Sequence, residues 1–534
     1  MSFRPNPPSF QQLSLFDGYR MLSDKKQRML KDSWATTFRD EIYANIDEEP
    51  YRKLFDEEGS ASRPNSPINT IVAAAIIKKM FRLSEEELFE SINLDLRYSY
   101  ALNLDSLSED VFSLRTYERL ISKVVAHREE TGEDLIQQTY DSLTEQIAKV
   151  MGIDKTNRRM DSFMVQMSAK DMSRRELIYK AIKGFVSYLF LIGDTEGISY
   201  MEHYTQDGDQ NNVLYRCPAE RRDDRDNALL KDASLLIEKC GDSYADEKAY
   251  KVFDRIISEQ TILDNDTRRF RNKNDGEFNS NIAQSTTDME ATFRSKAGKN
   301  HKGYVANVEE SVGKNGSLIT DYDFRPNNVS DQEMLSDRIE RSDVQNQKTV
   351  IVADGAYDND EIREAAAKKN IEIITTDMTG RKVPVELGAF NLIDNGRVVN
   401  TCPAGHSPLY SKYDEKTGQC HATFDAACCE RCPYSTMCKP KGKGKTRKVA
   451  ISQKKVQRAK RQAKLNGEER TKYSRFRNGV ETIPSYFRST LGVDDMEVYG
   501  LSRNRIHFGL DVIAFNIMKL IRFQRRQRAK CALA

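Results

Sequence analysis

The sequence predicts a multidomain α/β protein with a mixed-sheet core, an all-α N-terminal domain and two insertions. The chain has 534 residues, its N-terminal part has helical periodicity, and strands alternate with helices in its middle. A single hydrophobic core stops growing at about 250 to 300 residues, so two or three folding units are expected. The composition, 38% hydrophobic and 31% charged, is typical of globular proteins, and no apolar run is long enough to span a membrane.

The helical domain is expected over residues 1–150. Its clearest element is an almost continuous apolar run after Pro67, which predicts a buried helix. Ser84 and Glu87 have the spacing of a capping box for the next helix. The predicted helices cover residues 68–80, 84–92, 110–127 and 134–150.

The order of elements in the middle of the chain defines the core. Three strands come first and form an antiparallel meander with a turn at 314–316, and two further strands each follow a helix, which predicts parallel pairing. The order β-β-β-α-β-α-β-insertion-α is that of an RNase H-like fold. The strands are predicted at 158–167, 303–309, 318–324, 349–354 and 371–377, and the helices at 330–340, 359–369 and, after the insertion, near 480–490.

Two insertions divide this core into the segments 151–167, 300–378 and 473–525. The first insertion, 168–299, is helical. The second, 379–472, is rich in cysteine and leads into a basic tract. Between Lys439 and Arg477 there are sixteen Lys and Arg residues against two Glu residues, a net charge of about +14. Such a segment suits a polyanionic partner. The alternative is a solvated charged helix.

Three carboxylates occupy positions from which they could converge at one edge of this sheet. Asp161 lies in the first predicted strand, Asp354 ends the fourth, and Glu481 opens the last helix. Nucleotidyl transfer on DNA uses two metal ions about 3.5 to 4 Å apart, and Mg²⁺ prefers carboxylate ligands. Each acid also has a simpler interpretation. Asp161 could be a strand-end residue, Asp354 a turn residue before Gly355, and Glu481 a first-turn acid favoured by the helix dipole.

Four stretches extend this pattern: RMDSFM around Asp161, NHKGYVANV followed by LITDYDFRPNNVSDQEML, VIVADGAYDN around Asp354, and RNGVETIPSYFR around Glu481. In this ordered set the chain resembles the DDE-type bacterial insertion-sequence transposases with an InsH-like N-terminal domain, from about residue 13 to residue 520. The family has an Arg four residues before its glutamate and a basic residue seven after it, matched here by Arg477 and Arg488. Tyr473 precedes Arg477 by four residues, where the family has three.

The resemblance implies a transposase that binds transposon ends, hydrolyses the DNA to free a 3′-hydroxyl and joins it to target DNA. Asp161, Asp354 and Glu481 would bind two Mg²⁺ (or Mn²⁺) ions. The implied partners are terminal inverted repeats, target DNA and a second copy of the chain in a synaptic homodimer. The N-terminus does not read as a secretory signal, so we expect a cytoplasmic protein that is nucleoid-associated when bound to DNA.

Several basic residues are candidates for phosphate contacts. Arg477 and Arg488 would hold phosphates by bidentate contacts, with an ion pair to Glu481 as the alternative for these arginines. Lys302 could contact the DNA backbone or be a solvated hairpin lysine. In the basic tract, a set of cations could form one DNA-contacting helix face: Lys454, Lys455, Arg458, Lys460, Arg461 and Lys464.

The cysteine spacing predicts a structural zinc site. Cys429 and Cys432 form a CxxC pair, Cys438 follows after five residues, and Cys402 lies upstream in TCPAGH. Four thiolates from two knuckles make a closed tetrahedral zinc site, which can order a loop-rich insertion that lacks a core of its own. The alternatives are reduced, unligated thiols and other ligands in place of one of the four, namely Cys420, His406 and His421; Cys428, adjacent to Cys429, does not easily share the same geometry.

Two rival functions remain open. One is a non-catalytic, domesticated DNA-binding regulator that occupies transposon ends. The other is a different RNase H-like nuclease acting on branched or hybrid nucleic acid. Inverted repeats flanking the gene would favour the transposase over both.

Overall fold

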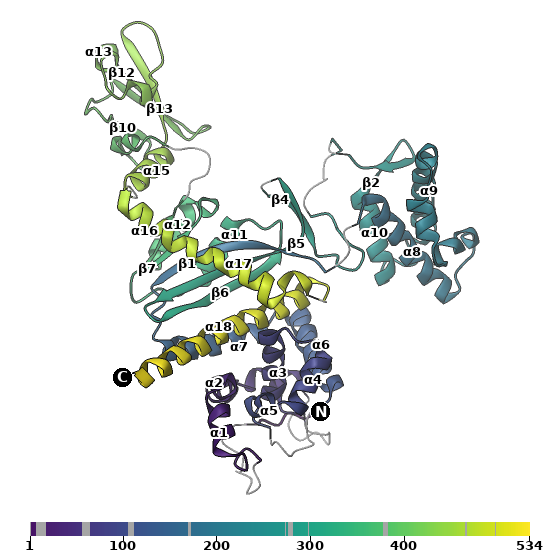
Figure 1. Cartoon of the computed structure of the whole chain (residues 1–534). Coiled ribbons are helices and arrows are strands. Elements are labelled where there is room, and N and C mark those ends of the chain that lie inside the picture. The colour runs from purple at the N-terminus through teal and green to yellow at the C-terminus, as the bar shows by residue number, and fades with distance from the viewer. Residues whose placement is uncertain are drawn as a thin grey trace. The chain divides into compact units, whose positions relative to one another are not determined.

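The structure, a computed structural model (Figure 1), divides the chain into two compact units. The first contains Met1–Lys155, Ser162–Ser330 and Ile483–Ala534, and the second contains Thr156–Asp161 and Asp331–Thr482. The residues described are 2–6, 18–55, 65–104, 112–168, 172–272, 274–275, 281–296, 298–376, 383–464, 467–496 and 498–533.

The first unit begins with helices, as the sequence predicts. The buried helix is α3 (Ile68–Phe81), which is apolar on nearly all sides and almost wholly buried. The capping box precedes α4: Ser84 Oγ accepts the Glu87 N–H at 3.1 Å, and Glu87 accepts the Ser84 N–H. In the described part of the chain, no helix is long and apolar enough to cross a membrane. The other helices are α1 (Asp24–Lys31), α2 (Trp34–Glu41), α4 (Glu85–Leu94), α5 (Leu96–Ala101), α6 (Leu114–Thr131) and α7 (Leu135–Met151).

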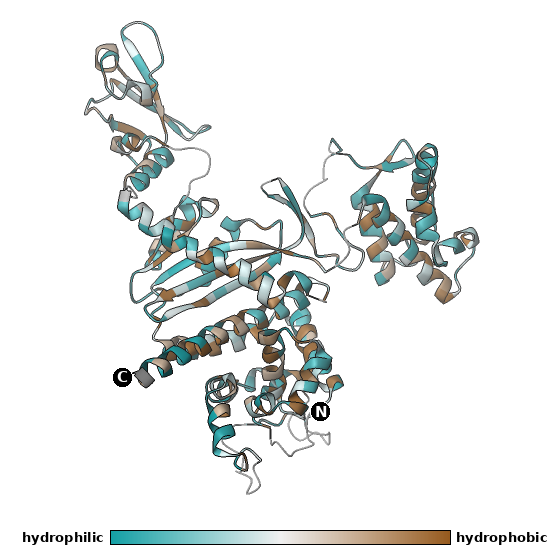
Figure 2. Ribbon diagram, in the orientation of Figure 1, coloured by the Kyte–Doolittle hydropathy of each residue, from teal (hydrophilic) through white to brown (hydrophobic). Residues whose placement is uncertain are grey.

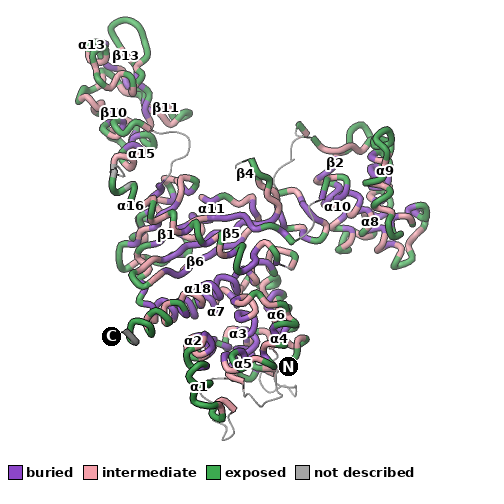
Figure 3. The backbone as a smooth tube through the Cα atoms, in the orientation of Figure 1, coloured by how far each residue is buried: buried purple, intermediate pink, exposed green. Residues whose placement is uncertain are grey.

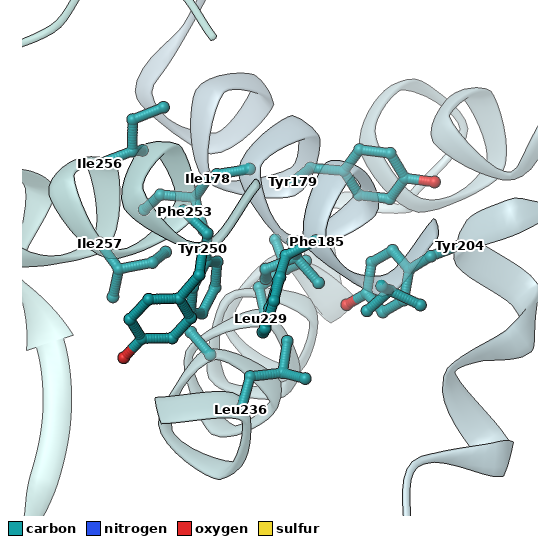
Figure 4. Close-up of a cluster of buried hydrophobic side chains, with 14 of the residues drawn as sticks. Ile178, Tyr179, Phe185, Tyr204, Leu229, Leu236, Tyr250, Phe253, Ile256 and Ile257 are labelled. Atoms are coloured by element: carbon teal, nitrogen blue, oxygen red, sulfur yellow. The ribbon is translucent and has the colours of Figure 1, made fainter. Parts of the chain in front are cut away.

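The predicted helical insertion contains three long helices with a core of their own (Figure 4). In this core the rings of Phe185 and Phe253 stack with centroids 5.3 Å apart. Short polar strands in the same segment were not predicted, because they show no alternation of apolar and polar residues. The elements are α8 (Arg174–Ile192), α9 (Arg222–Cys240), α10 (Lys248–Gln260), the hairpin strands β2 (Thr261–Asp264) and β3 (Thr267–Phe270), and β4 (Thr292–Lys296).

The main sheet has the strand order β4-β5-β1-β7-β8, with β6 pairing with β5. The two long strands β5 and β6 form an antiparallel hairpin that turns where predicted, between Gly313 and Gly316. Strand β1 pairs in parallel with β7, and β7 with β8. This mixed sheet with a helical N-terminal region confirms the predicted α/β class. The strands are β1 (Asn157–Gln166), β5 (Lys299–Gly313), β6 (Gly316–Pro326), β7 (Thr349–Ala353) and β8 (Ile371–Thr375).

Two helices of the second unit cover its strands. They are α11 (Asp331–Arg341) and α12 (Asp360–Lys368), both predicted from their periodicity. Their buried faces, including Leu335 and Ile362, form one cluster with Ile351 of β7. This packing fixes the carboxyl end of β7, where Asp354 lies.

The cysteine-rich insertion also has a small hydrophobic core, which includes Phe390, Phe424, Val449 and Val456. The expectation that this segment lacks a core is therefore wrong. Apolar residues at alternate positions of β12 and β13 turn to the same side and supply that core. The elements are β9 (Asn391–Ile393), β10 (Val398–Thr401), β11 (Tyr410–Asp414), β12 (Gln419–Asp425), α13 (Ala426–Glu430), α14 (Ser435–Cys438), β13 (Thr446–Ile451) and α15 (Gln453–Lys464).

The end of the chain differs from the prediction. We expected Glu481 to open the last helix, but it ends a 3-10 turn (Gly479–Glu481) that follows α16 (Gly467–Asn478). Pro484, in α17 (Thr482–Tyr486), has no N–H to donate, which interrupts α-helical bonding there. A π-helical turn (Phe487–Leu491) follows, and the last helix is α18 (Leu501–Leu533).

Candidate active site

Parallel strands bring Asp161 and Asp354 to neighbouring positions. Asp161 lies in β1, and Asp354 directly follows β7. Arg159 is paired with Val352 in the parallel register, and each aspartate lies two residues further along its chain. Asp354 Oδ1 also accepts the Ala356 N–H at 2.7 Å, which fixes this side chain as the cap of the next turn.

Glu481 reaches the same region because α16 is anchored to β1 by Arg159. The Arg159 Nη1 donates to the Phe476 carbonyl at 2.8 Å, and its guanidinium lies 5.6 Å from the centre of the Phe476 ring. A Cβ at Gly479 would overlap Arg159 Nη1, so only glycine leaves room for this contact. Sequence reasoning missed Arg159 as a positioning residue, although its place two residues before Asp161 was a usable signal.

Arg477 lies among the three predicted carboxylates. Its Nη1 is 3.1 Å from Glu481 Oε1, and its Nη2 is 3.5 Å from Asp161 Oδ2 and 4.0 Å from Asp354 Oδ2. The Arg477 side chain is 12% exposed, against 15% for Asp161, 31% for Asp354 and 54% for Glu481. The ion pair that the alternative interpretation expects is present, and the guanidinium also reaches both aspartates.

This arrangement concentrates negative charge around one cation. Three carboxylates from β1, the end of β7 and the turn after α16 are chemically suited to hard divalent metal ions. Within the described ranges, however, no three His, Cys, Asp or Glu side chains are placed to hold a metal ion. The carboxylates here meet through the guanidinium instead, and Arg477 Nε is buried without a hydrogen-bond partner among the described residues.

Arg488 and Lys302 lie in the first unit. The Arg488 guanidinium pairs with Asp494 at 3.1 Å, donates to the Met164 carbonyl at 2.8 Å and lies over the Phe163 ring. Lys302, in β5, donates through Nζ to the Met172 carbonyl at 3.1 Å. Lys302 is therefore partly buried and bonded, in contrast to the alternative of a solvated lysine.

The predicted basic helix exists as α15, and its cations divide into two groups (Figure 2 shows α15 and α16 as largely hydrophilic). Arg458 lies 3.7 Å from Asp358, and Arg461 lies 2.7 Å from Asp360 at the start of α12. On its other face, buried Val456 and Ala459 join the core of the insertion. The remaining exposed cations are Lys454, Lys455 and Lys460, while the side chain of Lys464 lies outside the described residues.

The four predicted zinc ligands, Cys402, Cys429, Cys432 and Cys438, line one cavity of about 20 Å³. His406 and Cys428 line this cavity as well. Cys420 is buried elsewhere, with its thiol 3.0 Å from the Gly396 carbonyl, and His421 Nε2 lies 3.9 Å from Asp414 Oδ2. Burial, together with the neighbouring thiols, raises the pKa of Cys429, and it raises that of Cys438 to about 11. The thiols thus line one cavity, but among the residues described no three His, Cys, Asp or Glu side chains are placed so that they could hold a metal ion.

Two regions of the chain match family profiles. Residues 401–521 match "Transposase DDE domain", and residues 26–123 match "Transposase domain (DUF772)". The first match includes Arg477, Glu481 and the cysteine cluster but neither aspartate, and the second lies within the N-terminal helices. No match was found among curated proteins or among solved structures. The two matches confirm the resemblance to DDE transposases of insertion sequences.

Proposed function

We propose that this chain is a DDE transposase that cuts DNA at transposon ends and joins the freed 3′-hydroxyl to target DNA. The observation that carries this proposal is the convergence of Asp161, Asp354 and Glu481 on one guanidinium from positions more than a hundred residues apart in sequence. The transposase-domain matches support the same function. The partners are transposon ends, target DNA and a second copy of the chain.

The chemistry has two displacements at phosphorus. Water first attacks the phosphodiester, the bond to the 3′-oxygen breaks, and that oxygen leaves as the 3′-hydroxyl. The hydroxyl then attacks a target phosphodiester and displaces another 3′-oxygen. Asp161, Asp354 and Glu481 would hold two Mg²⁺ or Mn²⁺ ions, which would supply Lewis-acid stabilisation of the attacking and leaving oxygens. Arg477 would donate paired N–H groups to a phosphate.

Cleavage of a labelled duplex carrying the inverted repeats that flank the gene tests this function. Asp161→Asn, Asp354→Asn and Glu481→Gln should each abolish Mg²⁺-dependent cleavage while end binding persists. Glu364→Gln, at an exposed position of α12, is the matched control and should cleave like the wild type. Full cleavage by one of the three variants would remove that residue from the site.

The same assay separates the rival functions. A wild-type protein that binds ends and never cuts would support the non-catalytic regulator. Cutting that ignores the end sequence and prefers branched or hybrid substrates would support another RNase H-like nuclease.

A structural zinc ion in the cysteine-rich insertion is the second part of the proposal. Support comes from the donor set: four thiols with two-knuckle spacing around one small cavity. Purified protein should contain about one zinc per chain, and Cys432→Ser should lose it and unfold the insertion at lower temperature. Cys531→Ser, at the exposed chain end, is the control. Protein purified without chelator that contains no zinc would contradict this part.

The basic helix is the third part. Lys454 and Lys455 are exposed and free to contact phosphates, whereas Arg458 also pairs with Asp358 within the protein. Replacing Arg458 should therefore lower stability as well as DNA affinity, and replacing the two lysines should affect affinity alone.

A further inference from the structure

The C-terminal end of α18 carries a dense positive charge outside the site described above. After Asp511 the chain contains six Lys and Arg residues and no acid. Lys519 is engaged within the protein, with Glu310 at 3.7 Å. The other five are exposed: Arg522, Arg525, Arg526, Arg528 and Lys530.

Packing does not explain this part of the helix. Ile521 is the last buried residue of α18, and Figure 3 shows the helix as exposed toward the C-terminus. Among the residues that the structure describes, Arg525, Arg526 and Lys530 have no carboxylate partner. The helix therefore continues for about three turns beyond its last buried residue, with Arg525, Arg526 and Lys530 exposed to solvent.

These cations form a stripe. Arg522, Arg526 and Lys530 follow each other at a spacing of four residues, and Arg525 lies three residues after Arg522, so all four share one face about 12 Å long. Like charges at these spacings destabilise a helix by about 0.2 to 0.5 kcal/mol per pair. The helix dipole favours cations only in the last turn, which accounts for Lys530 but not for the three arginines.

The face of α18 opposite the stripe contacts other helices of the same unit, because Gln524 and Arg528 lie about half a turn around the helix from Arg522 and Arg526. Arg528 Nη1 donates to the Lys31 carbonyl at 3.3 Å and lies 3.9 Å from Asp32, and Gln524 accepts the Thr37 hydroxyl at 2.5 Å. The α18 helix therefore rests on α1 and α2 through this face, and the stripe is left exposed to solvent.

At its inner end the stripe meets Tyr486. The Arg522 guanidinium lies 5.5 Å from the centre of the Tyr486 ring. In the chain Tyr486 comes five residues after Glu481.

We infer that the C-terminal stripe of α18 is a second DNA-contacting surface that binds the phosphate backbone of duplex DNA. The inference rests on the proposed function, which requires the protein to hold long duplexes. DNA suits the surface because it offers one negative charge per about 1.7 Å of axis, and a face of this length meets several phosphates. Such contacts carry no base specificity.

The test compares two triple variants of the full chain that lose the same charge. Arg522→Gln/Arg525→Gln/Arg526→Gln removes the stripe, and Lys231→Gln/Lys248→Gln/Lys251→Gln removes exposed cations of α9 and α10 as the control. The dissociation constant for an end duplex and an unrelated duplex is measured at several salt concentrations. The stripe variant should weaken binding to both duplexes equally and lower the slope of log K against log salt by about 2 to 3 units, with the control unchanged.

Two further variants guard against indirect effects. Replacing the three arginines with lysines should retain the slope, because the charge is kept. The double variant Arg525→Gln/Arg526→Gln, which leaves the Tyr486 contact intact, should lower the slope by about 1 to 2 units. Matched thermal unfolding of each variant shows that the fold is preserved.

The outcomes are distinct. An unchanged slope in the stripe variant, with a wild type that binds and cleaves DNA, overturns this inference and leaves the proposed function intact. A lowered slope with no Mg²⁺-dependent cleavage by the wild type supports the stripe and overturns the proposed function. Loss of binding to vesicles of phosphatidylcholine and phosphatidylglycerol, with DNA binding unaffected, would assign the stripe to an anionic membrane and overturn the inference.

Discussion

Replacing Arg477 with Gln tests whether its guanidinium occupies the cation position among the three proposed catalytic carboxylates. The guanidinium lies within 4.0 Å of Asp161, Asp354 and Glu481. Gln keeps hydrogen-bonding groups but carries no charge, so the carboxylates lose their shared counter-ion. We expect Arg477→Gln to bind Mn²⁺ more tightly than the wild type without DNA, because the metal no longer competes with a resident cation.

The exposure of the carboxylates sets the size of this effect. Glu481 is 54% exposed, so its pair is a surface pair, and Asp161 and Asp354 at 15% and 31% are only partly shielded from solvent. Pairs of this kind contribute between about 0.5 and 1 kcal/mol each after screening. Three of them amount to about 2 kcal/mol, which corresponds to about 30-fold in the dissociation constant of the metal.

Isothermal titration calorimetry with Mn²⁺ measures this change directly. Arg475→Gln, exposed on α16 two residues away, is the matched control and should bind Mn²⁺ like the wild type. Asp161→Asn should weaken binding, which assigns the measured site to these carboxylates. Mn²⁺ binding by Arg477→Gln that is equal to or weaker than that of the wild type would refute the idea that the Arg477 guanidinium occupies the position of a metal cation.

Three other predictions follow from the structure. Lys454→Ala/Lys455→Ala should lower the salt slope of DNA binding by about two units with unchanged unfolding, and an unchanged slope would reject this face of α15 as a DNA contact. Gly479→Ala should displace Arg159, because the new Cβ overlaps its Nη1, and slow cleavage about tenfold or more at constant DNA affinity; wild-type rates would show that Arg159 does not position the turn. Burial raises the pKa of Asp511 to about 6 from 3.8, so the folded state holds this proton more tightly than the unfolded state. The free energy of unfolding should therefore fall by up to about 3 kcal/mol as the pH rises from about 4 to about 6. Urea titrations should show this fall in the wild type and a flatter profile in Asp511→Asn; identical profiles would contradict it.

Much of the fold could be predicted because it depends on local periodicity. The apolar run of α3, the capping box at Ser84, and the alternation of strands and helices around β7 all follow from residues within one or two turns or strands. The sequence also predicted that the two strands that each follow a helix are added in parallel, and β7 and β8 do join the sheet in this way, β7 beside β1 and β8 beside β7. The predicted order of elements was the basis for expecting Asp161 and Asp354 at one edge of the sheet.

The sequence by itself also determined which residues are candidates for metal binding. These are the three carboxylates expected at one edge of the sheet and the four cysteines with the spacing of a zinc site. What only the tertiary structure decided is which charges meet. Arg477 reaches two aspartates that lie far from it in the chain, Arg159 holds the end of α16, and Arg458 pairs with Asp358 instead of facing solvent. Periodicity records only which face of an element is apolar; the partner of a long charged side chain depends on which elements pack beside it, and that is a property of the whole fold.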